Sequence, residues 1–264
     1  MAHDRCMGVA KRSARLARVL GQGLGDVVDL LLPCECPGCG QWDVALCEDC
    51  ESLLRARPGR CESAAPVLAG SASDPAFGVW SVARYAGAVR GIVLAWKGSG
   101  GRRVERAVAE AGREAGRLWH SELRAAGLAL DGQVAVVPAP SGRRRRASGR
   151  LVVRSLASEV ARGLEEAVRV DRASRGRVAA YDVLRRSGGR SRQSGLGVSG
   201  RAANRRGSMS VAPGLPGGAA CLLVDDVITS GATLAECRRA LRRAGHDVLG
   251  AFTLAATPAP AAAS

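Results

Sequence analysis

The sequence predicts an α/β protein in which helices flank a parallel sheet, preceded by a small module built on cysteines. Two apolar runs, at residues 133–138 and 220–224, have the continuous hydrophobic character of strands buried on both faces of a sheet. Segments with helical periodicity lie between and after these runs, as parallel strands require. Two Cys-x2-Cys pairs precede them all. With 264 residues, the chain can build one ordinary core and a small accessory module.

Composition divides the chain into four regions. Apolar residues recur at helical spacing between positions 15 and 32, and together with the cysteines that follow they define a helix and cysteine module at 15–54. Residues 55–76 are rich in Arg, Pro, Ala, Gly and Ser, which is typical of a linker. The main domain is expected at 77–256, and the Pro/Ala-rich tail at 257–264 is expected to be unstructured.

Strands and helices alternate along the main domain. The expected elements are a strand at 79–85, helices at 89–97 and 104–119, a strand at 133–138, a helix at 151–168 and a last strand at 248–255. Residues 187–209 carry many Arg, Ser and Gly residues with almost no apolar periodicity. They therefore predict a long loop, either a functional lid or a disordered segment.

Charge is high and uneven. The net charge is +15, and residues 141–207 hold 18 arginines against five acidic residues. Such a segment is typical of a surface that binds phosphates or nucleic acid. The competing interpretation is a coding preference for arginine, because lysine stands only at positions 11 and 97. An aromatic content of 3% weighs against a surface that stacks single-stranded bases.

No membrane span or secretory leader is expected. No apolar run approaches the roughly 18–20 residues that a transmembrane helix needs. The basic N-terminus is not followed by a compact apolar core with a small-residue cleavage site. We therefore expect a cytoplasmic protein whose thiols are kept reduced.

The two Cys-x2-Cys pairs predict a structural zinc site. Each pair can direct two thiolates at one ion, and together they supply the four soft ligands of a tetrahedral site. The expected ligands are Cys36, Cys39, Cys47 and Cys50. Disulfides are the competing account, although a reduced compartment disfavours them. A thioredoxin-like pair fits less well, because that motif occurs singly at the start of a helix. Cys34 and Cys61 have no assigned role.

The stretch at 220–233 carries the strongest functional signal. An apolar strand is expected to end at Asp225 and Asp226, and a short polar loop leads from there into a helix. Free backbone N–H groups at a helix N-terminus bind phosphate, and Gly231 allows close approach. Carboxylates would repel a phosphate, so they suit groups that donate hydrogen bonds, such as ribose hydroxyls. A sugar with a 5′-phosphate satisfies both halves. The alternative is a strand, a turn and a surface helix without a ligand.

This stretch resembles the phosphoribosyl-pyrophosphate (PRPP) motif of the type I phosphoribosyltransferases. The resemblance implies that Asp225 and Asp226, as catalytic residues, bind the ribose 2′ and 3′ hydroxyls. The implied 5′-phosphate loop consists of Thr229, Ser230, Gly231, Ala232 and Thr233. It also implies a type I phosphoribosyltransferase-like sheet for the main domain.

The order of motifs over residues 24–256 is similar to that of the ComF family, zinc-containing phosphoribosyltransferase-like proteins linked to DNA uptake in natural competence. The shared parts are the cysteine pairs, Tyr85-x-Gly87 with Lys97-Gly98, a strand ending in Pro-x-Pro, a loop with Arg192 and Gln193, and the PRPP motif. One departure is residues 147–150, Ala-Ser-Gly-Arg, where the family carries Arg-Gly-Phe-Asn.

The family resemblance implies two alternative functions. One is a transferase that moves the phosphoribosyl group of PRPP with Mg²⁺ and releases pyrophosphate, for which the candidate pyrophosphate ligands are Lys97, Pro140, Ser141 and Arg143. The other is a non-catalytic nucleotide-binding factor that works with single-stranded DNA and DNA-processing proteins. No residue in the sequence identifies an acceptor base.

Overall fold

The computed structural model describes residues 34–65, 67–68, 77–98, 101–140, 151–186 and 209–258. The helix expected at 15–32, almost all of the loop expected at 187–209 and most of the C-terminal tail lie outside these ranges.

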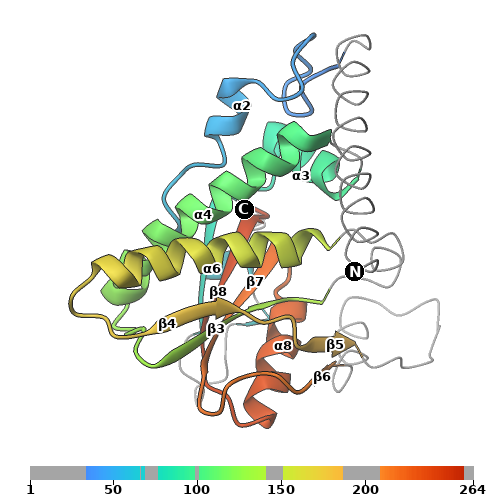
Figure 1. Cartoon of the computed structure of the whole chain (residues 1–264). Coiled ribbons are helices and arrows are strands. Elements are labelled where there is room, and N and C mark those ends of the chain that lie inside the picture. Colours follow the sequence, from blue (N-terminus) through green and yellow to red (C-terminus); the bar gives the residue numbers. More distant parts are fainter. Residues whose placement is uncertain are drawn as a thin grey trace, which may run out of the picture.

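A six-stranded sheet forms the centre of the protein, and five of its strands are parallel (Figure 1). The spatial order is β1-β2-β8-β7-β3-β4, with β1 antiparallel at one edge. The bounds are β1 Gly59–Arg60, β2 Gly78–Arg84, β3 Gln133–Pro138, β4 Arg177–Ala180, β7 Ala220–Ile228 and β8 Val248–Ala256. The strands expected at 133–138 and 220–224 are therefore neighbours, as β3 and β7.

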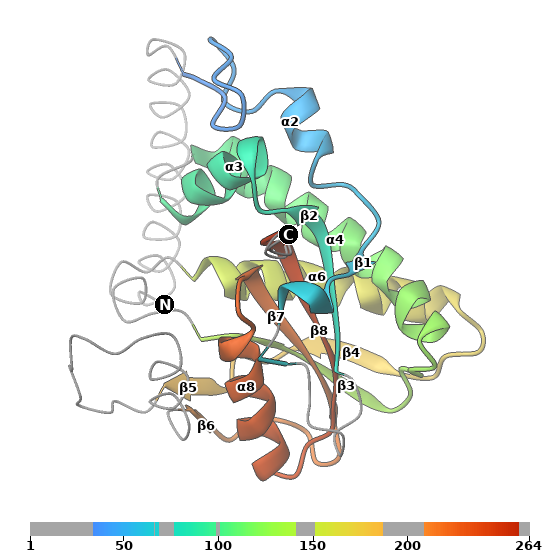
Figure 2. The same cartoon turned by 180° about the vertical axis from the view of Figure 1, so that it is seen from behind.

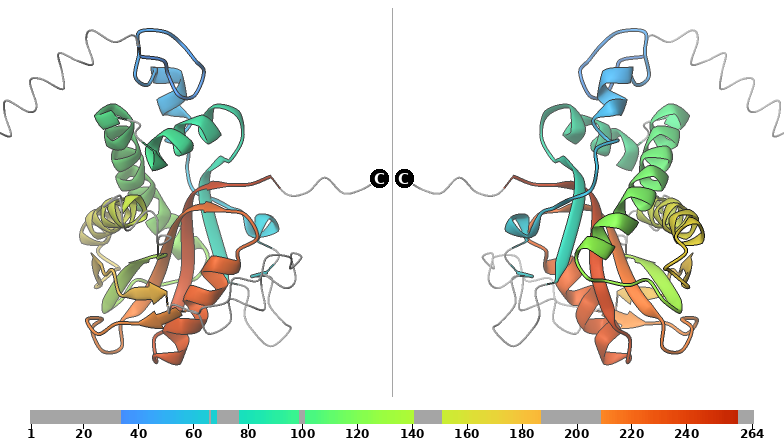
Figure 3. Two further views of the ribbon diagram at one scale, coloured as in Figure 1. Left: turned by 90° about the vertical axis from the view of Figure 1, so that its right-hand side faces the viewer. Right: turned by 90° about the vertical axis from the view of Figure 1, so that its left-hand side faces the viewer.

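Helices cover both faces of the sheet. Their bounds are α2 Glu48–Ser52, the 3-10 turn η1 Glu62–Ala64, α3 Gly87–Lys97, α4 Gly101–Ala125, α6 Val152–Val170 and α8 Ala232–Arg243. Viewed from the side, α4 and α6 lie on one face (Figure 3), and from behind α8 and η1 lie on the other (Figure 2). The helices expected at 89–97, 104–119 and 151–168 are confirmed. The first and last differ from expectation by at most two residues at each end, whereas α4 extends six residues further at its C-terminus.

The larger core fills the space between the sheet and helices α3, α4 and α6. Trp119 of α4 lies at its centre, with ring centroids 5.8 Å from Trp80 and 5.6 Å from Phe252 of the sheet. Helices α4 and α6 approach closely because glycines line their contact: a Cβ on Gly163 would lie 1.9 Å from the carbonyl oxygen of Arg113. Burial of these rings and of the apolar faces of α3, α4 and α6 stabilises this half of the protein.

A second core lies between the sheet and α8. It contains Leu223 of β7 and Cys237 of α8, and it also buries Ala65 and Leu68. The latter two belong to the segment expected as a linker, and the same segment supplies β1 and η1. This part of the segment packs into the domain because its few apolar residues cover one end of the sheet. Its Arg/Pro/Ala composition did not reveal this.

Two short strands that the sequence did not predict form a separate antiparallel pair. β5 (Leu184–Arg186) pairs antiparallel with β6 (Met209–Val211). Runs of three residues are too short to show alternation, and β4 is similarly short. In the described part of the chain, no helix combines the length and apolar character that crossing a membrane requires.

Candidate functional site

The two acids of the 220–233 stretch lie inside β7 and do not end it, contrary to the prediction. The strand continues to Ile228 because Val227 and Ile228 pair with Ala255 and Ala256 of β8. Successive side chains of a strand point to opposite faces. The two carboxylates therefore have different surroundings, although both lie near the carboxyl end of a central parallel strand, where α/β sheets bind ligands.

Asp226 belongs to the face that packs against α3. It is buried, and its Oδ1 lies 2.8 Å from Nζ of Lys97, the last residue of α3. Lys97 was a candidate for pyrophosphate from sequence, and in the structure it forms an ion pair with the acid expected to hold ribose. The pattern of apolar residues could place Lys97 at a helix end but not opposite a particular acid.

Asp225 belongs to the face that packs against α8. Its Oδ1 accepts a hydrogen bond from the backbone N–H of Asp226 at 2.8 Å. Burial and the negative charge of Asp226 raise the pKa of Asp225 from 3.8 to about 7, against the opposing effects of that hydrogen bond, Lys97 and Arg186. Arg186 of β5 was not singled out from sequence, because only the fold brings β5 near β7. Carboxylates with raised pKa values cluster at functional sites.

The residues expected to bind phosphate form a compact loop between β7 and α8. Gly231 is the N-cap residue of α8 and has φ +76°, a left-handed conformation that favours glycine. Asp225, the exposed Thr229 and the N-terminus of α8 line a cavity of about 40 Å³. One water needs about 10–15 Å³, so the cavity holds a few waters or one small anion. Its lining comprises Asp225 and residues 227–234.

A segment from the expected linker covers this loop. The backbone N–H of Val67 donates to the carbonyl oxygen of Ser230 at 3.2 Å. A Cβ on Gly231 would lie 3.0 Å from both Ala65 and Leu68. Glycine at this position therefore serves backbone conformation and packing of the covering segment, two requirements beyond the approach of an anion predicted from sequence.

Gly231→Ala is expected to lower the free energy of unfolding by about 1–3 kcal/mol, combining left-handed strain with overpacking. Gly245→Ala is the matched control, because Gly245 has φ +82° at the other end of α8 with no neighbour within 4 Å. Urea unfolding of both variants separates the two contributions. Equal losses would show that Ala65 and Leu68 move aside freely.

The other pyrophosphate candidates are only partly placed. Pro140 is buried two residues after β3, and the N–H of the preceding Ala139 donates to the carbonyl oxygen of Val224 at 2.8 Å. This contact brings the end of β3 beside the acids. Ser141 and Arg143 lie outside the described residues. Among the described candidates, the structure therefore brings Lys97 and Pro140 to the same end of the sheet as the loop expected to bind phosphate.

The four cysteines of the two Cys-x2-Cys pairs come together and can hold a structural metal ion such as zinc. Each pair, Cys36 with Cys39 and Cys47 with Cys50, is called a knuckle below. Their sulfur atoms all lie within 4.8 Å of one another, and Cys47 Sγ is 3.6 Å from Sγ of both Cys36 and Cys39. Four sulfurs bound at about 2.3 Å to one ion lie roughly 3.8 Å apart, whereas disulfide sulfurs are bonded at about 2.0 Å. The set fits zinc in number, type and spacing.

The first knuckle stabilises a thiolate. Although burial opposes it, hydrogen bonds from the backbone N–H groups of Cys47, Cys39 and Gly38 lower the pKa of Cys36 to about 6. Burial, with the neighbouring thiols, raises the pKa of Cys50. A bound cation would favour the ionised form of all four thiols, because metal ligation requires thiolates.

The knuckle packs directly on α3, the helix that ends at Lys97. A Cβ on Gly91 of α3 would lie 1.9 Å from the carbonyl oxygen of Pro37, and a Cβ on Gly38 would lie 2.5 Å from Cys50 Sγ. From α2, the buried Glu51 accepts a hydrogen bond from Arg103 of α4 at 2.7 Å. The cysteine module is thus attached to the helical layer over the Asp226 face.

Part of the basic segment is paired with acids where the structure describes it. Arg162 and Arg169 of α6 pair with Glu159 and Glu165 of the same helix at 2.6 and 2.9 Å. From α4, Arg113 pairs with Glu166. Two of these pairs lie within α6, and the third joins α4 to α6. Arg172, Arg175 and Arg177, which follow α6, are exposed. The arginine run at 143–146 and the arginines after position 186 lie outside the described residues.

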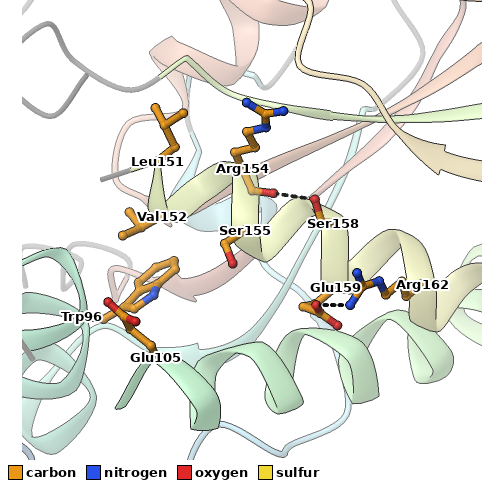
Figure 4. Close-up of a pocket in the computed structure, with 9 residues that line it drawn as sticks. All are labelled: Trp96, Glu105, Leu151, Val152, Arg154, Ser155, Ser158, Glu159 and Arg162. Carbon is orange, nitrogen blue, oxygen red and sulfur yellow. Dashed lines mark hydrogen bonds and ion pairs between the residues drawn. The ribbon is translucent and has the colours of Figure 1, made fainter. Parts of the chain in front are cut away.

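A larger cavity of about 520 Å³ opens where the starts of α4 and α6 diverge (Figure 4). Its polar groups are mostly engaged within the chain. Glu159 pairs with Arg162, and the Ser158 hydroxyl donates to the carbonyl oxygen of Arg154 at 3.0 Å. Trp96, on its floor, is buried and offers little ring surface for stacking. The cavity has the volume of a ligand site without a converging set of unpaired polar groups.

No protein-family model matches the chain, and no curated protein matches its sequence. The candidate site is therefore described by its geometry alone. It consists of two acids and a loop lining a small cavity at one end of a parallel sheet. A four-cysteine cluster packs on α3, the helix whose last residue reaches the acids.

Proposed function

We propose that this chain binds PRPP, a ribose with a 5-phosphate and a 1-pyrophosphate. The observation that supports this most is the small cavity between Asp225 and the N-terminus of α8. Backbone N–H groups and hydroxyls of residues 229–233 would hold the 5-phosphate, which the positive end of the helix dipole also favours. Asp226 would accept hydrogen bonds from the ribose hydroxyls. Lys97, whose Nζ lies 2.8 Å from Asp226 Oδ1, would bind further phosphate.

Mg²⁺ fits this site as a companion of the substrate. Mg²⁺ keeps several waters and binds one or two carboxylates together with substrate phosphates. The acids of β7 supply such carboxylates, and among the described residues the only group of three or more metal-binding side chains is the cysteine cluster. Bound there with PRPP, Mg²⁺ would neutralise charge on the pyrophosphate. Asp225 and Asp226 would orient the ribose.

In the transferase version of the proposal, the bond between ribose C1 and pyrophosphate oxygen breaks while an acceptor forms a bond to C1. Pyrophosphate leaves with both bonding electrons, and the acceptor loses a proton to solvent. The transition state has oxocarbenium character, as in glycosyl transfer. The carboxylates of β7 would favour that developing positive charge. The accessory version, a ComF-like factor for DNA uptake, uses the same pocket without turnover.

The test is calorimetry with PRPP and Mg²⁺, followed by pyrophosphate release with a panel of nucleobases. Binding with release supports the transferase, and binding without release in any mixture supports the accessory factor. Absence of PRPP binding by the zinc-loaded protein would reject both.

Asp226→Asn is expected to weaken PRPP binding by about 1.5–3 kcal/mol, because it removes a charge from a hydrogen-bonded contact while preserving shape. Asp247→Asn is the control, since Asp247 is an exposed acid just before β8, at the opposite end of the sheet. Both variants lose one negative charge, so long-range electrostatics are matched. Equal affinities for the two variants would refute a ribose contact at Asp226.

A further inference from the structure

We infer that Lys97 exchanges partners when ligand binds, and that this exchange makes the site select sugar phosphates carrying a second anion. In the structure, Lys97 pairs with Asp226. When ribose hydroxyls engage Asp226, the ammonium group moves to the anionic group at C1 of the sugar. This inference rests on the proposed function, and its tests are arranged so that the two can fail separately.

Burial makes the Lys97–Asp226 pair costly to break. The side chains of Lys97 and Asp226 are only 18% and 12% exposed, with 2.8 Å between Nζ and Oδ1. Breaking a shielded pair by removing one partner leaves a poorly solvated charge, which is costly. A ligand that takes Asp226 from Lys97 must therefore supply a replacement anion or bind weakly.

The position of Lys97 suits such a movement. It is the last residue of α3, and Gly98 follows in a non-helical conformation, with its N–H bonded to the carbonyl oxygens of Leu94 and Ala95. The backbone at the end of α3 is thus fixed by hydrogen bonds. The ammonium group can still move, because it is joined to that backbone by a flexible four-carbon side chain. A cation at a helix C-terminus is also favoured by the dipole.

The choice of lysine is unusual in this chain. Of 39 basic residues, only those at positions 11 and 97 are lysines. An arginine could grip Asp226 through two parallel hydrogen bonds in a fixed fork, whereas an ammonium is a point charge on a flexible stem. Lysine at position 97 gives a contact that can be released, which a permanent structural ion pair would not need.

The consequence for specificity is direct. Ribose 5-phosphate offers the hydroxyls and the 5-phosphate but strands the ammonium of Lys97. PRPP offers the same groups and an anion for Lys97. Specificity arises here as much from the penalty against the wrong ligand as from contacts with the right one.

Calorimetry with the two ligands tests this. The zinc-loaded protein is expected to prefer PRPP–Mg²⁺ over ribose 5-phosphate by about tenfold or more. Lys97→Met keeps the apolar stem and removes the charge, so PRPP affinity should fall while the preference approaches unity. Arg90→Met, on an exposed position of the same helix, is the charge-matched control and should behave like the parent protein.

A second measurement follows Lys97 directly, also if Lys97→Met folds poorly. Biosynthetic ¹³Cε-lysine gives two lysine NMR signals, and Lys97→Arg assigns the one from position 97. PRPP–Mg²⁺ should shift the Lys97 signal, and Asp226→Asn should shift it without ligand. If calorimetry shows PRPP binding but the signal stays and Lys97→Met keeps its preference, the exchange is wrong and the proposed function stands. If the parent protein binds no PRPP, both are overturned.

Discussion

Asp225→Asn is expected to be more stable than the parent protein at pH 8. Burial and the charge of Asp226 raise the pKa of Asp225 to about 7 from 3.8. The folded protein therefore binds a proton that the unfolded chain has already lost between about pH 4 and pH 7. Its stability must fall as pH rises across that interval and then level off. Asparagine does not ionise, so the variant lacks this fall.

The expected gain at pH 8 is about 1–3 kcal/mol, because a one-unit shift corresponds to about 1.4 kcal/mol and neighbouring charges relax to offset part of it. Urea unfolding from pH 4 to pH 8, with zinc saturating and without ligand, measures it. Asp247→Asn is again the control. The same Asp225→Asn variant should bind PRPP more weakly. A stability curve that coincides with that of the parent would show that Asp225 is solvated and unperturbed.

Higher stability with weaker binding would identify Asp225 as a residue retained for ligand binding at a cost in stability. Carboxylates placed side by side in a buried strand are a poor solution for stability alone, and such local conflicts are typical of functional sites. A purely structural acid would show the opposite, with loss of stability on neutralisation.

Cys39→Ser is expected to remove the metal and to loosen both the knuckle and the start of α3. The native cluster should hold about one zinc per chain, and loss of one of four thiolates removes much of a binding free energy that reaches about 10–16 kcal/mol in zinc-dependent modules. Metal analysis and hydrogen exchange report the two effects. The larger core extends to the other three cysteines, but its centre at Trp119, Trp80 and Phe252 packs without them, so the sheet should remain folded.

Two controls make this prediction specific. Cys61→Ser changes a half-buried cysteine outside the cluster, whose thiol lies near the carbonyl oxygen of Val79, and should keep the metal. Gly91→Ala keeps all four ligands but places a methyl group against Pro37, so α3 should loosen while zinc is retained. A Cys36–Cys39 disulfide in protein purified under reducing conditions would instead contradict the metal site.

Much of the architecture was predictable because it depends on local pattern. Continuous apolar runs marked β3 and the first half of β7, and helical periodicity marked α3, α4 and α6 with small errors at their ends. The Cys-x2-Cys spacing predicted a cluster that the fold does assemble. These signals are periodic or strictly spaced, so they survive without knowledge of distant contacts.

The tertiary structure decided which side chains face each other. Lys97 and Asp226 are 129 positions apart along the chain and meet only because the fold places the end of α3 near β7. Arg186 approaches Asp225 only because the fold places β5 near the Asp225 face of β7. The covering of Gly231 by Ala65 and Leu68 arises in the same way. Sequence alone therefore determined the elements and the candidate chemistry of this protein. Long-range packing decided which charges are shielded together, and thus how strongly each can act.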